Sequence, residues 1–575
     1  MLSFFDWIIV CFFTFIILFF GLIVSKKSSE NSKEYFLSGR KLPWWLLGIS
    51  MVATTFSADT PNLVTEIVRK DGIAGNWQWW AFSLTGMMTV FFYAKLWRRS
   101  KVLTDLEFYE KRYSGKEAAF LRAFRAIYLG LFFNVMIMAS VSLAGIKIGG
   151  LLLDLSPVEC VFFTSVFTVI YSTLGGLRSV IFTDFIQFIL AMIGSIWACI
   201  YIVSMDEIGG LNSLFTHSNV ENKLNFFPDI NDYKSFFSLF IIPIAVQWWS
   251  VWYPGSEPGG GGYIAQRMLS AKNENHALKA TLLFNVFHYA LRPWPWILIA
   301  LSSLIIFPEL DDISKSFSHV DLNVIGHDLA YPAMLSNLPS GLLGLMLASL
   351  IAALMSTLSS HLNWGSSYLT LDFYKRFINK DATENQIVNV GKISTVLLMI
   401  TSSIIALFLD SALSAFKILL QIGAGTGLIF ILRWFWWRIN AYTEIIAMVS
   451  SLFIAYYFNF INVGLDNWKK IVMGAIITTF IWIIATFITP ADDEEKLQKF
   501  VDKVNPGGPG WKRFYKDRHV HWDVPNGISA MILGCIIIYG LLIGTGQFIY
   551  GNSVFGIIFF ILVIISLIRL KTKFN

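Results

Sequence analysis

Charged residues are scarce in this chain. They make up 14% of its 575 residues, whereas soluble domains carry about 25%. A soluble protein of this length would form roughly four domains, and so few charges could not cover their surfaces. The net charge of +6 comes from basic residues in short segments between apolar runs, which is not the pattern of a nucleic-acid-binding face. Soluble enzymes, nucleic-acid-binding proteins and disordered scaffolds are therefore excluded.

Cysteine is rare, and familiar catalytic motifs are missing. The four cysteines lie inside apolar runs and form no Cys-x-x-Cys pair: Cys11, Cys160, Cys199 and Cys535. Isolated cysteines in such surroundings are typical of packing residues rather than of disulfides or metal ligands. The sequence contains neither His-Glu-x-x-His nor Gly-x-Ser-x-Gly, and its histidines are scattered. We therefore predict that the protein is not an enzyme.

Long apolar runs occupy most of the sequence, and 55% of the residues are hydrophobic. A run of about 20 apolar residues crosses a bilayer as a helix. Trp residues gather at the ends of runs, as at 44–45 and 434–437, which is typical of the aromatic belts at a membrane surface. We predict an all-α polytopic membrane protein with about fifteen spans. Their expected cores are 3–24, 43–67, 74–97, 118–151, 156–175, 180–204, 236–264, 277–306, 338–371, 386–409, 413–433, 441–460, 468–489, 527–548 and 552–570.

Basic residues concentrate in every second loop of this arrangement. Arg98 and Arg99 follow the third span, for example, and Arg267 follows the seventh. Because loops rich in Lys and Arg stay on the cytoplasmic side, we predict that the N-terminus lies outside and the C-terminus inside the plasma (inner) membrane. The remaining large inside segment, 490–526, is predicted to be a solvated connector.

Two of the spans contain sequences that interrupt a helix. The second carries a hydroxyl-rich stretch at 53–61 that ends in proline, and the seventh carries two prolines and four consecutive glycines at 253–262. Taken singly, the first stretch fits an ordinary packing face and the second fits a loop between shorter helices. Broken helices at matching places in two halves are typical of inverted-repeat transporters, whose site lies near the midplane. The matched placement favours a transporter.

Hydroxyl groups and one acidic residue supply candidate ligands for a cation. Ser356, Ser359 and Ser360 share one face of the ninth span, and several oxygen ligands suit a hard cation such as Na⁺. The alternative is that these hydroxyls bond back to their own helix. Asp184, near the start of the sixth span, is either a functional intramembrane acid or an interfacial residue.

Several stretches, taken in order, resemble the sodium:solute symporter family, which includes sodium/sugar, sodium/proline and sodium/sialic acid symporters. They are Tyr35–Arg40, Gly175–Leu177 with Thr183, Asp184 and Gln187, Tyr263–Arg267 with Ala271 and Lys272, and Ser356–Ser359 with Asp372–Lys375. The resemblance implies a LeuT-like core of two inverted five-helix repeats. The implied parts are an extra helix and inside loop at 1–42, a first repeat at 43–204, an outside loop at 205–235, a second repeat at 236–433 and four additional helices at 434–575.

The same resemblance implies that sodium is the coupling ion. Its principal site would comprise backbone oxygens and two hydroxyls, from Ala53, Phe56, Ala353, Ser356 and Thr357. Some family members hold a second sodium ion. Its ligands would match Asp184, Ser356, Ser359 and Ser360.

The resemblance also implies a solute cavity between core helices. Its lining would include Thr55, Ser57, Thr60, Gln78 and Gln421, with His288 where sugar-transporting members have a lysine. Trp252 or Tyr253 would cover the solute from inside. The third core helix offers no arginine to clamp a carboxylate, as sialic acid carriers do, which favours a neutral, sugar-like solute.

We therefore predict a secondary active symporter that couples inward sodium flow to the uptake of a small polar solute. Its other expected partner is the lipid bilayer, with no nucleic acid and no obligate protein partner. Three alternatives stay open. One is a sodium/amino-acid or organic-acid symporter, another is a proton-coupled carrier of the same fold in which His288 or Asp184 takes the proton, and the last is a transporter-like solute sensor.

Overall fold

The computed structural model describes residues 2–25, 32–250, 258–320, 324–409, 420–461, 464–515, 522 and 524–574. Throughout these residues the chain is helical or in loops and has no β-strand. Nine of the described helices are long and apolar enough to cross a membrane: Gly115–Leu153, Gly176–Val203, Glu274–Ile306, Leu342–Ile378, Glu384–Ala406, Ala441–Phe458, Asn467–Ile488, Val524–Ile549 and Ser553–Thr572. Shorter apolar helices are Phe4–Ile17, Trp44–Thr55, Pro157–Ile170 and Tyr233–Ala245. The protein is an all-helical, multi-pass membrane protein.

The described helices have the following bounds. The longer ones are α1 (Phe4–Ser25), α3 (Trp44–Thr55), α4 (Asp59–Asp71), α9 (Gly115–Ile127), α10 (Asn134–Leu153), α11 (Pro157–Val203), α16 (Glu274–Val286), α17 (Pro293–Ile306), α20 (Leu342–Ser367), α21 (Glu384–Ala406), α24 (Ala441–Phe460), α25 (Asn467–Ile488), α26 (Glu494–Val504), α28 (Val524–Ile549) and α29 (Ser553–Phe574). The shorter ones are α2 (Ser32–Leu37), α5 (Trp77–Trp80), α6 (Ser83–Met88), α7 (Ala94–Ser100), α8 (Glu107–Arg112), α12 (Gly210–Thr216), α13 (Tyr233–Phe236), α14 (Ile242–Ala245), α15 (Gly262–Ser270), α18 (Leu310–Ser316), α19 (Ala330–Leu335), α23 (Gly427–Leu432) and α27 (Lys512–Tyr515).

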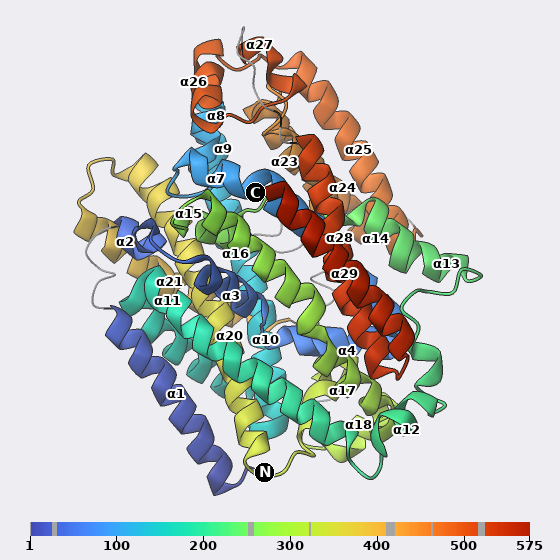
Figure 1. Ribbon diagram of the computed structural model, residues 1–575. Helices are drawn as coiled ribbons and strands as arrows, with labels where there is room; N and C mark the ends of the chain where they lie inside the picture. The colour runs from blue at the N-terminus through green and yellow to red at the C-terminus, as the bar shows by residue number, and fades with distance from the viewer. Residues whose placement is uncertain are drawn as a thin grey trace.

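Helices far apart in the sequence pack together around α3 and α20. Helix α3 contacts α11, α16 and α20, and α10 contacts α11, α20 and α21. Helix α1 lies on the outside of this group against α11 and α20, while α24 pairs with α25 and α28 with α29. Figure 1 shows α26 and α27 at the end of the molecule opposite the N-terminus, α12 and α18.

The predicted interruption of the second span is confirmed. Helix α3 ends at Thr55, and α4 begins at Asp59 after three non-helical residues. Phe56 leaves the helical conformation with φ −86° and ψ 74°, and its N–H still bonds Val52 O at 2.7 Å. Pro61 fits in the first turn of α4, where a proline removes no helical hydrogen bond. The expected span 43–67 is therefore two helices joined at 56–58.

The second predicted interruption lies partly outside the described residues, because 251–257 are not described. On one side α14 ends at Ala245 and a single 3₁₀ turn, Gln247–Trp249, follows. On the other side Gly259 and Gly260 have positive φ before α15 begins at Gly262. The described part of this segment thus breaks the helix as predicted. Helix α11 is also kinked, at Gly176 (φ 53°), where a Cβ would lie 2.8 Å from Tyr35 O.

The count of about fifteen spans stays a prediction. The expected span 74–97 is divided into the short helices α5, α6 and α7 with 3₁₀ and π turns. Part of the expected span 413–433 falls on 410–419, which lies outside the described residues. The division of the chain into two inverted repeats likewise stays a prediction.

The prediction of a solvated connector at 490–526 is wrong for its described first part. Helix α26 buries Leu497, Phe500, Val501 and Val504. The ring of Phe500 packs on Phe108, with centroids 5.8 Å apart, and Trp511 Nε1 donates to Trp434 O at 2.8 Å. The physical reason is that α26 is amphipathic and has an apolar surface to pack on, formed by α8 and the residues that follow α23.

Candidate functional site

The interruption between α3 and α4 lies directly against α20. Thr357 Oγ1 donates to Thr54 O at 2.9 Å, and the Thr54 and Ser360 hydroxyls are 2.8 Å apart. These bonds join residues about 300 positions apart in the sequence. They bring the predicted broken helix and the predicted hydroxyl face of the ninth span to one place. Thr54 was not among the predicted site residues, although it sits among the hydroxyl-rich residues of the interruption.

All five residues predicted for the principal sodium site are buried: Ala53, Phe56, Ala353, Ser356 and Thr357. Helix α20 is continuous from Leu342 to Ser367. Ala353, Ser356 and Thr357 therefore stand at i, i+3 and i+4 and share one face. A hydroxyl that donates one hydrogen bond keeps lone pairs on its oxygen. Ser356 and Thr357 can thus bind a cation while they hold their present partners.

Asp184 accepts hydrogen bonds from two hydroxyls and lies fully buried in protein. Ser50 Oγ donates to its Oδ2 at 2.5 Å, and Ser356 Oγ donates to its Oδ1 at 2.6 Å. Asp184 thus links α3, α11 and α20. Ser359, by contrast, donates to Ser356 O at 2.9 Å, as the back-bonding alternative predicts.

Arg267 completes this network and was missed as a site residue. We counted it with the charges of an inside loop, but its side chain is fully buried on α15. Its Nη2 lies 3.7 Å from Asp184 Oδ2 and donates to Ser360 Oγ at 2.7 Å, while Nε donates to Ser50 Oγ at 3.3 Å. The guanidinium balances the carboxylate in the place where the second sodium site was predicted. The only sequence signal was its place in the family-like stretch 263–267.

A second polar cluster surrounds the end of α3. His288 Nδ1 lies 3.1 Å from Thr55 Oγ1, and Arg292 Nη1 donates to the same oxygen at 3.4 Å. Thr60 Oγ1 donates to Thr55 O at 3.2 Å, and the side chain of Ser57 is buried. Four predicted solute residues therefore meet at one interruption, and Arg292 adds a cation to them.

The other residues predicted for the solute site are Gln78 and Gln421, with Trp252 or Tyr253 as the inner cover. Gln78 Nε2 donates to Asp71 Oδ2 at 3.5 Å in an exposed position. Gln421 is buried on the helical turn at 420–424. The predicted inner covers, Trp252 and Tyr253, lie outside the described residues.

The arginines at the start of the third core helix are committed to other partners. Arg122 Nη2 lies 2.7 Å from Asp372 Oδ1, and Arg125 Nη1 lies 3.8 Å from Glu444 Oε2. The prediction that this helix offers no arginine to clamp a solute carboxylate stays a prediction.

Comparison with known families decides the identity. The model of the sodium:solute symporter family matches residues 35–452. The chain belongs to this family. The sodium/glucose cotransporter of Vibrio parahaemolyticus is 27% identical over 507 residues, which cover 86% of this chain and 92% of that protein. Human sodium/myo-inositol cotransporter 2 is 26% identical over 479 residues, which cover 78% of this chain and 68% of that protein.

A solved structure agrees with this assignment at the level of the fold. The structure of a Na⁺-coupled sialic acid symporter in a substrate-bound, outward-open state superposes with a TM-score of 0.69. It covers 85% of this chain and 99% of that one at 21% sequence identity. This symporter family member therefore has the LeuT-like fold that the resemblance implied.

Proposed function

We propose that the protein is a secondary active symporter in which inward sodium flow drives the uptake of a small polar solute. One observation carries the proposal: Thr357 on α20 bonds Thr54 O, one residue before α3 ends. A carbonyl freed at a helix break and hydroxyls on a facing helix are the ligands that an alkali ion requires inside a membrane. Sodium would join the two helices, and this closure would raise solute affinity. By linkage the solute would raise sodium affinity equally.

The principal sodium site would use the oxygens that meet between α3 and α20. Ala53 and Phe56 would contribute backbone oxygens from the interruption. Ala353 would contribute a carbonyl, and Ser356 and Thr357 their hydroxyls, from one turn of α20. This set carries no formal charge. When the sodium ion leaves, no buried anion therefore stays behind without a counter-charge.

A second sodium ion would bind at Asp184 together with the hydroxyls of Ser356, Ser359 and Ser360. Asp184 already accepts a bond from Ser356 at 2.6 Å. Arg267, 3.7 Å from Asp184, supplies a positive charge there in this structure. The two cations would compete for one carboxylate, so movement of the guanidinium would accompany binding of the second ion.

The solute would bind beside the interruption, at Thr55, Ser57, Thr60 and His288. Hydroxyl and imidazole groups both donate and accept hydrogen bonds, which suits a neutral solute rich in hydroxyl groups. Two of the similar proteins are named for glucose and myo-inositol. We therefore propose a sugar-like solute. Gln421 would complete the lining, and Gln78 would reach the solute only after leaving Asp71.

The membrane arrangement that serves this function would have about fifteen spans. Two inverted five-helix repeats at 43–204 and 236–433 would form the core, with one helix before them and four after. The N-terminus would lie outside and the C-terminus inside the plasma membrane, because the basic loops alternate.

Uptake into proteoliposomes of the purified protein tests the function. A mixed pool of sugars, amino acids and organic acids is offered with an inward sodium gradient, or with choline in place of sodium at fixed pH. We expect sodium-dependent accumulation of a sugar or polyol. Equal uptake in choline that follows a proton gradient would assign a proton-coupled carrier instead. Solute binding without any accumulation would assign a sensor.

A further inference from the structure

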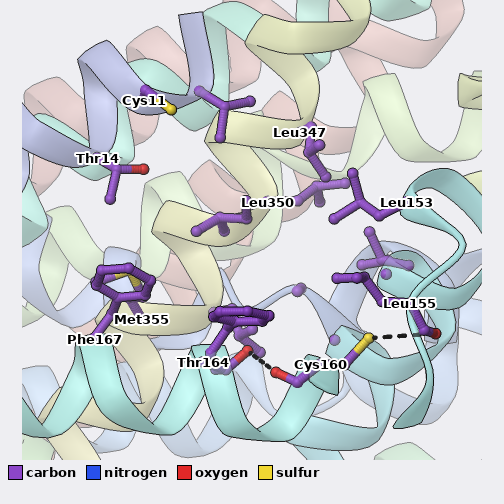
Figure 2. Close-up of a pocket in the computed structure, with 18 of the residues that line it drawn as sticks. Cys11, Thr14, Leu153, Leu155, Cys160, Thr164, Phe167, Leu347, Leu350 and Met355 are labelled. Atoms are coloured by element: carbon purple, nitrogen blue, oxygen red, sulfur yellow. Dashed lines mark hydrogen bonds between the residues drawn. The ribbon is translucent and has the colours of Figure 1, made fainter. Parts of the chain in front are cut away.

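A cavity of about 620 Å³ lies between α1, α10, α11 and α20, apart from the sodium and solute residues. Figure 2 shows side chains of these four helices around it, among them Thr14, Cys160, Leu350 and Met355. Apart from a few threonine and cysteine groups, its lining is aliphatic and aromatic. The transport mechanism proposed above makes no use of it.

The cavity begins near the ends of α1 and α20 that lie together, and its lining extends along α20 to Met355. Helix α20 begins at Leu342, and Asp6 near the start of α1 accepts the Gly344 N–H at 2.8 Å, so both helices begin at the same face. Met355 lies thirteen residues beyond Leu342, which is about 20 Å along a helix, whereas half of the hydrocarbon core is about 15 Å. Ala58, in the interruption between α3 and α4, also lines the cavity.

Two polar side chains in the lining bond nearby backbone carbonyls. Thr164 Oγ1 donates to Cys160 O at 2.7 Å, and Cys160 Sγ lies 3.9 Å from Leu155 O. An apolar cavity of about 150 Å³ stays free of water and takes up apolar molecules, and this cavity is far larger. The cost of an empty cavity grows with its volume. An apolar molecule that fills the cavity would therefore stabilise it more than water would.

We propose that the cavity binds one acyl chain of a membrane lipid from the leaflet in which α1 begins. The lining is continuous with the surface that faces lipid, where Phe15 of α1 and Phe163 of α11 are 66% and 48% exposed. Its lining extends from Leu155, between α10 and α11, to Met355 on α20, which suits a flexible chain whose headgroup stays at the surface. The end of the chain touches Ala58 in the helix interruption.

Photolabelling tests the proposal in proteoliposomes of the purified full chain. The probe is phosphatidylcholine with a diazirine at the end of one acyl chain, and labelled peptides are identified by mass spectrometry. We expect labelling of 145–167 and 347–355 to exceed that of the lipid-facing helix α29. Thr14→Trp fills the cavity and is expected to lower this labelling about tenfold. Phe12→Trp changes an exposed residue of the same helix that does not line the cavity, and is expected to leave labelling unchanged.

Cys11→Trp, on the same face as Thr14, serves as a second filling variant, and thermal stability in detergent checks the folding of all three. Labelling no stronger than at α29, or unchanged in folded Thr14→Trp and Cys11→Trp, would show ordinary surrounding lipid and overturn the proposal. A disulfide dimer formed through Cys11, with no lipid label, would assign the cavity to a second copy and also overturn it. Because labelling needs no transport, these outcomes are independent of the proposed symport.

Discussion

Two hydroxyl groups of α20 are held in place beside the interruption of α3. Thr357 bonds Thr54 O, and Ser356 bonds Asp184, so both hydroxyls are oriented before any ion arrives. An oriented ligand loses little conformational freedom on binding. The proposed sodium ligands Ser356 and Thr357 are therefore largely pre-positioned.

Replacing either hydroxyl on α20 tests the principal sodium site. We expect Ser356→Ala and Thr357→Ala to raise the sodium concentration for half-maximal uptake about tenfold, since a lost ligand or hydrogen bond of ~1.4 kcal/mol is a factor of ten. Ser366→Ala is the matched control, because this buried hydroxyl on the same helix bonds its own helix at Asn363 O. An unchanged sodium dependence in both site variants would contradict the assignment.

Asp184→Asn tests the second sodium ion. The amide keeps the shape of the side chain but removes its charge, so we expect about one positive charge fewer to move with each solute. Simultaneous measurement of current and solute flux gives this ratio. Asp206→Asn, in the exposed loop after α11, is the control. If the ratio is the same in Asp184→Asn and the wild type, only one sodium ion is coupled.

Thr55→Val tests the solute site. Valine keeps the shape of the side chain and removes the hydroxyl that bonds His288 and Arg292. We expect the solute half-saturation to rise about tenfold at saturating sodium. Thr281→Val removes a buried hydroxyl that bonds only Ala277 O in its own helix, and it should leave uptake unchanged. Equal effects of the two variants would indicate a packing role for Thr55.

At the scale of the element, Arg112 of α8 locks together the segment 433–439, Asp492 and Trp511. Arg112 is fully buried, and its Nε donates to Arg433 O at 3.1 Å and its Nη2 to Ile439 O at 3.2 Å. Its guanidinium lies 4.7 Å from the ring centre of Trp511 and 3.7 Å from Asp492. Burial raises the pKa of Asp492, although the positive charge of Arg112 acts to lower it. The segment that we expected to be solvated is therefore fixed to the end of the helical core.

Removing Arg112 is expected to weaken this lock. Arg112→Ala leaves buried carbonyls and a carboxylate unpaired, which costs about 3–5 kcal/mol. We expect a lower thermal unfolding temperature in detergent and faster proteolysis within 490–515. Lys499→Ala, in an exposed ion pair with Glu495 on α26, should leave the unfolding temperature nearly unchanged. Equal unfolding temperatures for the two variants would show that the lock does not stabilise the fold.

At the scale of the whole molecule, the alternation of basic loops predicts which loops lie on the same side of the membrane. Cysteines placed at Ser218, between α12 and the following turn, and at Lys499 on α26 would report opposite sides. In a background without the four native cysteines, an impermeant maleimide on intact cells should label the first position and not the second. If the maleimide labels Lys499→Cys and not Ser218→Cys, the orientation is the reverse of the one proposed.

The sequence predictions succeeded where the interactions join neighbouring residues and failed where they join residues far apart in the sequence. The interruption at 56–58 was predictable because hydroxyl-rich residues and Pro61 act locally on the helix. Burial of Arg267 was not, because its partner Asp184 is 83 positions away and the charge alone suggested a loop. The assignment of Gln78 to the solute stays a prediction, and its Nε2 donates to Asp71 Oδ2 at 3.5 Å.

The sequence by itself determined that this chain lies in a membrane, that it is helical, that one core helix is broken, and which family it belongs to. These properties depend on composition, periodicity and local backbone preferences, which are written along the chain. Only the tertiary structure decided that Thr357 meets Thr54, that Arg267 faces Asp184, and that α26 packs against α8. Such contacts arise when separate helices bury their faces against one another, and no local pattern specifies which faces will meet.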